Sequence, residues 1–109
     1  MKFMEIEDIG EVIAERVLKR SVNNAEPQDV VVRLGKPRQY PGGTDYFCPF
    51  EISGLGEPKI RYAAGVDGFQ SLQLALRIIS TLLQHYKREP SVDLRWLEQG
   101  DDLGFPGET

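Results

Sequence analysis

The sequence has few of the residue types that most often carry catalysis or bind metals. Its 109 residues include one cysteine, one histidine and one tryptophan. A single cysteine cannot form an intramolecular disulfide bond, so a reducing cytoplasm is the expected location. One cysteine and one histidine, without metal-ligand spacing, also cannot supply the ligand set that zinc requires. We therefore expect a cytoplasmic protein that holds no metal and no cofactor.

An excess of positive charge is also missing. Lys and Arg number 13 and Asp and Glu number 17, for a net charge of −4, whereas general nucleic-acid binding needs a basic surface. No apolar run is long enough to cross a membrane, because Gln73, Arg77 and Ser80 interrupt the most apolar stretch. The first residues turn acidic after Lys2 without an apolar region, so we expect no secretory signal. These patterns predict neither a nucleic-acid nor a membrane partner.

What is present is typical of a small globular protein. Hydrophobic residues make up 40% and charged residues 28% of the chain, which suits one domain with a real core. We expect residues 1–10 to be poorly ordered or to form a short helical turn, and residues 107–109 to be poorly ordered. Residues 12–40 are rich in Lys and Arg, and residues 89–109 are rich in acids. Either this is ordinary solvated surface, or the acidic tail packs against the basic segment or faces a basic partner.

Residues 66–90 predict one long helix, around which the rest of the chain is organised. Asp67 suits the N-cap, and Gln70 stands at the capping-box spacing from it. Pro90 cannot continue a helix, so the end is expected near residues 87–88. The start and stop signals therefore agree on a single element.

This helix is apolar over more than half of its circumference. One face carries Phe69, Leu72, Ala75, Leu76, Ile79, Leu82, Leu83 and Tyr86. The opposite face carries Gln70, Gln73, Arg77, Ser80, Thr81, Gln84 and Arg88. Leu74 and Ile78 widen the apolar arc to about 200°, against the roughly 100° stripe of a surface helix. One sheet cannot cover such an arc, so we expect the C-terminal tail or a second copy of the chain to pack against Leu74 and Ile78.

The residues before the helix predict an antiparallel sheet. Residues 11–22 fit a helix slightly better by propensity, but the turn chemistry of residues 23–27 favours a hairpin and hence a strand. Three further strands follow from alternation and β-branched residues: 29–35, 45–53 and 59–64. Residues 36–44 hold two prolines and two glycines and predict a loop. The predicted fold is α+β, a four-stranded antiparallel meander covered on one face by a single long helix, in two layers.

The alternation also predicts which side chains face the helix. The expected inward positions are Val30, Val32, Leu34, Tyr46, Cys48, Phe50, Ile52, Ile60, Tyr62 and Ala64. Phe47 and Glu51 are expected on the opposite face. After Pro90 we expect a short extended or 3₁₀ segment, with Leu103 and Phe105 as a final anchor.

Several motifs resemble those of a known family. They are DY-x-CP-F at residues 45–50, GVD-x-x-Q-x-L-x-LAL at residues 65–76 and LGFP at residues 103–106. The chain is similar over roughly residues 12–106 to a family of small uncharacterised bacterial proteins that is described as a domain of unknown function. The resemblance implies a soluble cytoplasmic bacterial protein with a strand near its start. It implies no activity and no catalytic residues.

The residues give little support to enzymatic chemistry. A nucleophilic cysteine needs a lowered pKa and a nearby base, but Cys48 lies mid-strand among apolar residues, where a thiol behaves as a small hydrophobe. His85, the only histidine, lies on the border of the polar helix face. Glu98, Asp101 and Asp102 resemble an exposed turn more than a calcium site. We therefore expect no catalytic residues and no metal ligands, and these patterns favour a protein that is not an enzyme over an enzyme.

The most plausible binding surface is an aromatic and Gly-rich loop. Its candidate residues, for a ligand or a partner, are Lys36, Arg38, Tyr40, Phe47 and Arg61. The first hypothesis is a non-catalytic protein-interaction module that uses this loop or the outer face of the sheet. The alternative is a small-molecule or anion binding protein that uses the loop at 36–47 with Arg61, and a structural homodimer is a third possibility. Tyr40 and Tyr46 equally suit a role in packing beneath the loop.

Overall fold

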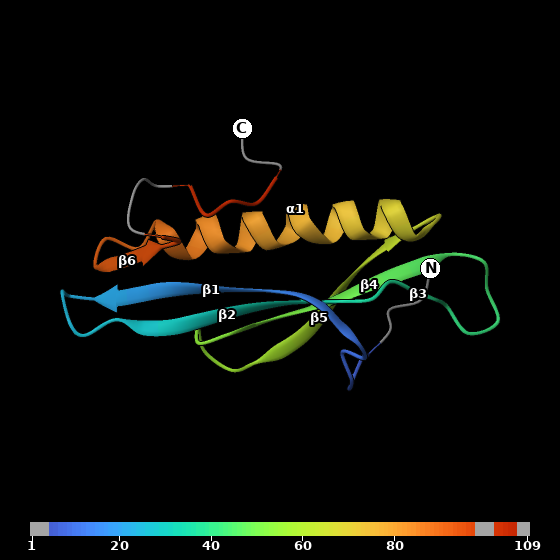
Figure 1. Cartoon of the computed structure of the whole chain (residues 1–109), viewed down its shortest axis with the longest axis horizontal. Coiled ribbons are helices and arrows are strands. Elements are labelled where there is room, and N and C mark those ends of the chain that lie inside the picture. The colour runs from blue at the N-terminus through green and yellow to red at the C-terminus, as the bar shows by residue number, and fades with distance from the viewer. Residues whose placement is uncertain (1–4, 98–101, 107–109) are drawn as a thin grey trace.

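The computed structural model describes residues 5–97 and 102–106, and in them an antiparallel sheet packs against a single helix. Figure 1 shows the two layers. The elements in chain order are β1 (Val12–Val22), β2 (Gln28–Gly35), β3 (Arg38–Gln39), β4 (Tyr46–Ser53), β5 (Lys59–Gly65), α1 (Gly68–Lys87) and β6 (Val92–Arg95). The α+β class and the single helix are confirmed. The sheet in the described residues has six strands, however, rather than four.

The two additional strands lie where the sequence predicted a loop and a tail. β3 is a two-residue strand inside the predicted loop, and it pairs with the start of β4. β6 lies in the tail and pairs antiparallel with the end of β1, from Val22↔Val92 to Lys19↔Arg95. A strand of two residues is too short to show an alternating pattern of apolar and polar residues in the sequence. β6 does alternate, and its Leu94 is buried in the core.

β1 confirms the prediction of a strand at the start of the chain. It pairs antiparallel with β2, and the connecting turn places Asn23 and Asn24 at φ 52° and 60°. Two successive left-handed residues define a type I′ hairpin turn, for which asparagine is favoured. The turn is closed by a hydrogen bond of 3.0 Å that the Ala25 N–H donates to the Val22 carbonyl. The asparagine pair therefore outweighed the helical propensity of β1.

α1 begins and ends where its sequence signals predicted. The Asp67 side chain accepts a hydrogen bond of 2.8 Å from the Gln70 N–H, and the Gln70 side chain accepts one of 2.8 Å from the Val66 N–H. Ala75, Ile79 and Leu83 along the helix are fully buried. The helix is thus fixed to the sheet along its length.

Two residues of α1 were assigned to the wrong environment. Phe69 was expected on the buried face but is 81% exposed. It shares a flank with Leu76, but it lies in the first turn and does not line the groove beside the C-terminal segment. Ser80 was expected on the polar face but is only 3% exposed. It shares a flank with Leu76, one turn earlier, which lines the groove beside the C-terminal segment.

The C-terminal segment packs on the flank of α1 opposite to the predicted one. Leu103 belongs to the buried core, and Phe105 lines a small groove of about 230 Å³ together with Leu76 and Ile79. In Figure 1 the segment runs alongside the helix, and it also borders β1, whose Arg16 lines the same groove. Leu74 and Ile78, where the tail or a second copy was expected, are not part of this contact, and Ile78 stays 38% exposed.

Arg16 of β1 attaches this segment. Its Nη1 donates hydrogen bonds of 3.2 and 2.8 Å to the carbonyls of Leu103 and Gly104, and its guanidinium lies 3.8 Å from the Trp96 ring centre and 4.7 Å from that of Phe105. The tail therefore meets the basic hairpin through carbonyls and aromatic rings in this contact. Of the tail acids, Glu98, Asp101 and Glu108 lie outside the described residues.

The core lies between the strands and α1, and it corrects the predicted facing of β5. Cys48, Phe50 and Ile52 of β4 are buried against the helix as predicted. Cys48 pairs with Ala63 across the strands, so both side chains point to the helix. The expected inward set of Ile60, Tyr62 and Ala64 therefore faces outward, because the register of β5 is set by its pairing with β4.

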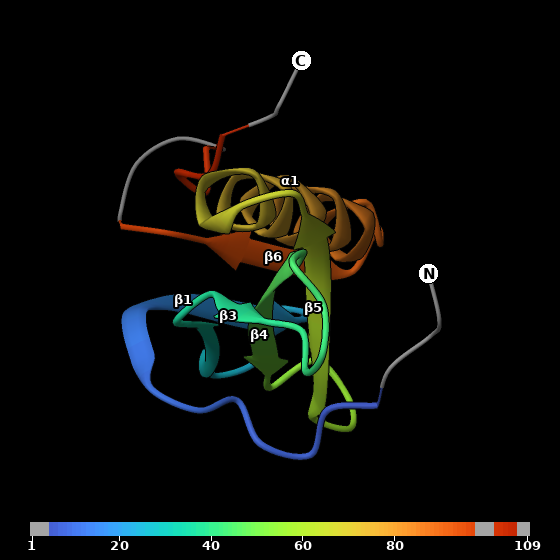
Figure 2. The ribbon, with the colours of Figure 1, turned by 90° about the vertical axis from the view of Figure 1, so that its right-hand side faces the viewer.

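The N-terminal segment covers part of the outer face of the sheet. Figure 2 shows it passing beneath the strands, on the side away from α1. Residues 5–10 form no helical turn, contrary to one expectation, and residues 1–4 lie outside the described part. A Cβ on Gly35 would lie 2.6 Å from the Ile9 carbonyl oxygen and 2.7 Å from Pro49 Cγ, so the segment packs closely on β2 and β4. In the described residues, no helix is long and apolar enough to span a membrane.

Candidate functional site

The predicted loop residues gather in an aromatic cluster on the outer face of the sheet. The Tyr40 and Phe47 ring centres are 5.1 Å apart, and both rings contact Tyr62 of β5, at 6.5 and 6.1 Å. The Arg38 guanidinium lies 5.0 Å from the Phe47 ring centre. Burial, then the neighbouring Tyr62, then Asp45 raise the pKa of the Tyr40 hydroxyl. Tyr62 was not among the predicted site residues, because it was assigned to the inner face.

This cluster holds the loop in place. Phe47 is only 6% exposed, so its ring is not presented to a partner. The Nη2 of Arg38 donates a hydrogen bond of 3.0 Å to the Asp8 carbonyl, and the Lys36 N–H donates one of 2.8 Å to the Glu11 carbonyl. Lys36 itself is exposed. The arrangement attaches the N-terminal segment to β3 and the end of β2.

Arg61, the fifth predicted site residue, lies on the other face of β5. It pairs across the strands with Phe50, whose side chain belongs to the core on the helix side. Direct cross-strand partners share a face, so Arg61 points to the helix side of the sheet. The structure therefore brings Arg38, Tyr40 and Phe47 together and separates Arg61 from them.

Arg61 instead lines an open groove of about 580 Å³. Its walls come from the N-terminal segment, from β4 and β5 and from α1, and its lining residues are Glu5, Ile6, Glu7, Phe50, Lys59, Ile60, Arg61, Tyr62 and Ile78. Consecutive residues of a strand point to alternate faces. A groove lined by four consecutive residues of β5 therefore runs along the edge of that strand. We call it the β5-edge groove.

The edge of β5 that borders this groove is unpaired. β5 pairs with β4 on one side, and no other strand pairs with it in the part of the chain that the structure describes. An unpaired edge presents a row of N–H and C=O groups that another extended chain can bind. An edge position depends on which strands pair, and the predicted meander, which ends with residues 59–64, already leaves that strand with a single neighbour.

The two sides of the β5-edge groove carry opposite charges. Lys59 and Arg61 pair with Ile52 and Phe50, so they line the groove from the helix side. Glu5 and Glu7 line it from the N-terminal segment, which passes on the outer side. The half-exposed Ile78 adds an apolar surface on the helix side. The groove is therefore apolar in its floor, basic on one side and acidic on the other.

Cys48 is not positioned for nucleophilic chemistry. Its side chain is fully buried, and burial raises the pKa of the thiol to about 11. The thiol lies 3.4 Å from the Gly35 carbonyl oxygen. A thiol with this pKa stays protonated at neutral pH, whereas the thiolate is the reactive form. Within the described residues, no group of three or more His, Cys, Asp or Glu residues could hold a metal ion.

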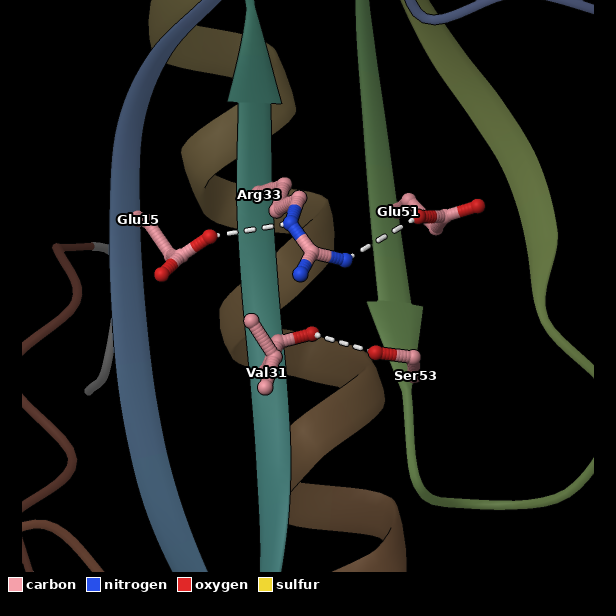
Figure 3. Close-up of polar contacts among 5 residues, drawn as sticks. All are labelled: Glu15, Val31, Arg33, Glu51 and Ser53. Atoms are coloured by element: carbon pink, nitrogen blue, oxygen red, sulfur yellow. Dashed lines mark hydrogen bonds and ion pairs between the residues drawn. The ribbon is translucent and has the colours of Figure 1, made fainter.

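The rest of the outer face carries a ladder of ion pairs rather than a site (Figure 3). Arg33 of β2 donates from Nε to Glu15 at 2.9 Å, and its Nη1 lies 3.5 Å from Glu51. Beside it, the Ser53 hydroxyl donates to the Val31 carbonyl at 3.5 Å. Each charge already has a partner on a neighbouring strand. The ladder supports the register of β1, β2 and β4 and leaves no free charge of its own to recruit a ligand.

Most of the chain matches one protein family. The model of a family described as a domain of unknown function, DUF6968, matches residues 14–107. The chain belongs to this family. The DUF6968 match covers all of the sheet and helix except the first two residues of β1. No curated protein and no solved structure matches this chain.

Proposed function

We propose that the protein is a non-catalytic protein-interaction module that binds an extended segment of a partner polypeptide along β5. The observation that carries the proposal is the β5-edge groove, in which an unpaired strand edge adjoins an apolar floor. Strand addition gives affinity through main-chain hydrogen bonds, and the side-chain pockets beside the edge give specificity. The protein would act in the cytoplasm, where its single thiol stays reduced.

The predicted binding residues have different roles in the proposed binding. Arg61 contacts the partner directly, because it lines the groove. Arg38, Tyr40 and Phe47 act indirectly, since they fix β3 and the N-terminal segment that forms one side of the groove. Lys36 contributes positive charge near this segment.

A small-molecule or anion binding function is the second candidate. The groove volume of about 580 Å³ falls within the range of ligand pockets, about 300–1,000 Å³. Lys59 and Arg61 are the two cations in its lining, while Lys36, Arg38 and Tyr40 line neither of the two grooves described here. An anion would therefore bind at Lys59 and Arg61 rather than in the 36–47 loop.

The test compares two exposed apolar residues of the same helix. Peptides selected from a random display library on the wild-type protein are measured against Ile78→Lys and Phe69→Lys by isothermal titration. Ile78 lines the groove, whereas Phe69 is exposed outside it. We expect at least about a tenfold loss of affinity with Ile78→Lys, which corresponds to about 1.4 kcal/mol, and no change with Phe69→Lys.

Circular dichroism and thermal unfolding establish that both variants fold. Peptides that bind both variants equally, or a library that yields no binder, would contradict the proposal. Binding of citrate or phosphate that is lost with Arg61→Ala, without any peptide binder, would support the second candidate.

A further inference from the structure

The charges of the β5-edge groove specify its occupant more closely. We infer that the groove selects a two-faced strand, with acidic side chains on one face and basic side chains on the other. This inference rests on the proposed function, because it assumes that an extended segment pairs with β5. It adds the chemical pattern of that segment.

The two charged sides of the β5-edge groove lie on opposite faces of the sheet. Lys59 and Arg61 are two residues apart on β5 and point to the helix side of the sheet. Glu5 and Glu7 are also two residues apart and line the groove from the segment on the outer side. The opposite charges therefore stand above and below the plane in which an added strand would lie.

A strand added along β5 would present its side chains to both of these sides. Successive side chains of an added strand point alternately to the helix side and to the outer side. Acidic residues at alternate positions would meet Lys59 and Arg61, and basic residues at the positions between them would meet Glu5 and Glu7. A segment with mixed charges on each face would place like charges together, which is destabilising.

A second copy of this chain fits the groove less well. Antiparallel pairing of two β5 edges about a two-fold axis perpendicular to the sheet keeps each face on its own side. Lys59 and Arg61 of both copies would then lie on one face, and the acidic residues of both copies on the other. This repulsion favours a different polypeptide as the occupant.

The experiment uses two synthetic peptides of the same composition. The two-faced peptide alternates Glu and Lys around a central Val-Tyr-Val, so that each face carries one sign of charge. The control peptide contains the same residues with Glu and Lys mixed on both faces. Titration into the wild-type protein at low salt should show at least about tenfold tighter binding of the two-faced peptide, and added salt should reduce the difference.

Charge-reversal variants of the protein test whether the two charged sides cause the preference between the two peptides. The variant Lys59→Glu/Arg61→Glu makes both sides acidic and should lose the preference for the two-faced peptide. Adding Glu5→Lys/Glu7→Lys to that variant restores opposite signs with the sides exchanged. Because a strand can shift by one residue and so exchange its faces, the fourfold variant should regain the preference.

The outcomes separate this inference from the proposed function. If library peptides depend on Ile78 but the two designed peptides bind equally, the groove binds strands and the charge pattern is refuted. If the fourfold variant folds but does not regain the preference, the arrangement of the two sides is also refuted. Sedimentation that shows wild-type self-association, abolished by Ile78→Lys, would identify a second copy as the occupant and contradict the inference.

Discussion

Cys48 illustrates how position decides the chemistry of a single residue. The sequence placed it on a strand face shared with Phe50 and Ile52, and its burial beside them is confirmed. Desolvation disfavours the charged form of an acid, so the thiolate is disfavoured and the pKa of the thiol rises to about 11. The residue that most resembles a nucleophile in the sequence is therefore part of the core.

The raised pKa of Cys48 predicts a loss of stability at alkaline pH. Between the ordinary thiol pKa of 9.0 and the folded value of about 11, the unfolded chain loses the proton and the folded chain keeps it. The free energy of unfolding should therefore fall as pH rises through this window, by up to about 1.4 kcal/mol per pH unit. Urea unfolding at about pH 8 and about pH 10 measures the change.

Cys48→Ala is the control, because it lacks the titrating thiol while the other ionisable groups remain. The wild-type protein should lose about 1 kcal/mol more than the variant between these two pH values. An equal loss in both proteins would show that the thiol does not contribute.

At the scale of the element, the helix was more predictable than the strands. The caps of α1 are local signals, so Asp67 and Pro90 fixed its ends without knowledge of the rest of the fold. Which side chains of β5 face the helix depends on which residues of β4 lie opposite them. The sequence of β5 alone does not determine that register. β3 is too short to show a period, and Ser80 is buried although Arg77 and Thr81 beside it on the helix are exposed.

The N-cap of α1 gives a prediction at the same scale. Asp67→Ala removes the side-chain acceptor that bonds the Gln70 N–H at 2.8 Å. The free energy of unfolding should fall by about 1 kcal/mol, the usual cost of losing such a cap. Chemical denaturation followed by circular dichroism measures it.

Asp67→Ser keeps an acceptor at the N-cap and should retain most of the stability. If the Ala and Ser variants are equally destabilised, the loss does not come from the capping hydrogen bond.

At the scale of the molecule, the two ends of the chain complete the structure in ways that composition did not reveal. The tail was expected to cover the helix, and it does, but on the flank of Leu76 rather than that of Ile78. The N-terminal segment supplies one side of the β5-edge groove. A site that includes residues 5–7 could not be predicted while those residues were expected to be poorly ordered or to form a short helical turn. Of the five candidate binding residues, Arg38, Tyr40 and Phe47 lie close together, whereas Arg61 lies on the other face of β5.

Leu103 should contribute to the stability of the whole fold. Its side chain is 1% exposed and belongs to the core, although it lies near the end of the chain. Leu103→Ala should lower the free energy of unfolding by about 2–5 kcal/mol, the range for a buried leucine. Urea denaturation measures this value in a single cooperative transition.

Leu97→Ala removes an equally large side chain that is 70% exposed, and it should cost less than about 0.5 kcal/mol. Similar costs for the two variants would mean that residue 103 does not pack into the core.

The pairing of β6 with β1 has a kinetic consequence. Lys19 pairs with Arg95, 76 positions further along the chain, so the sheet closes through contacts that are remote in sequence. Ordering such contacts costs loop entropy before any stabilisation is gained, and sheets of this kind fold over milliseconds to seconds. Until that last strand docks, the end of β1 is an open edge, and a chaperone that shields it would act during this interval.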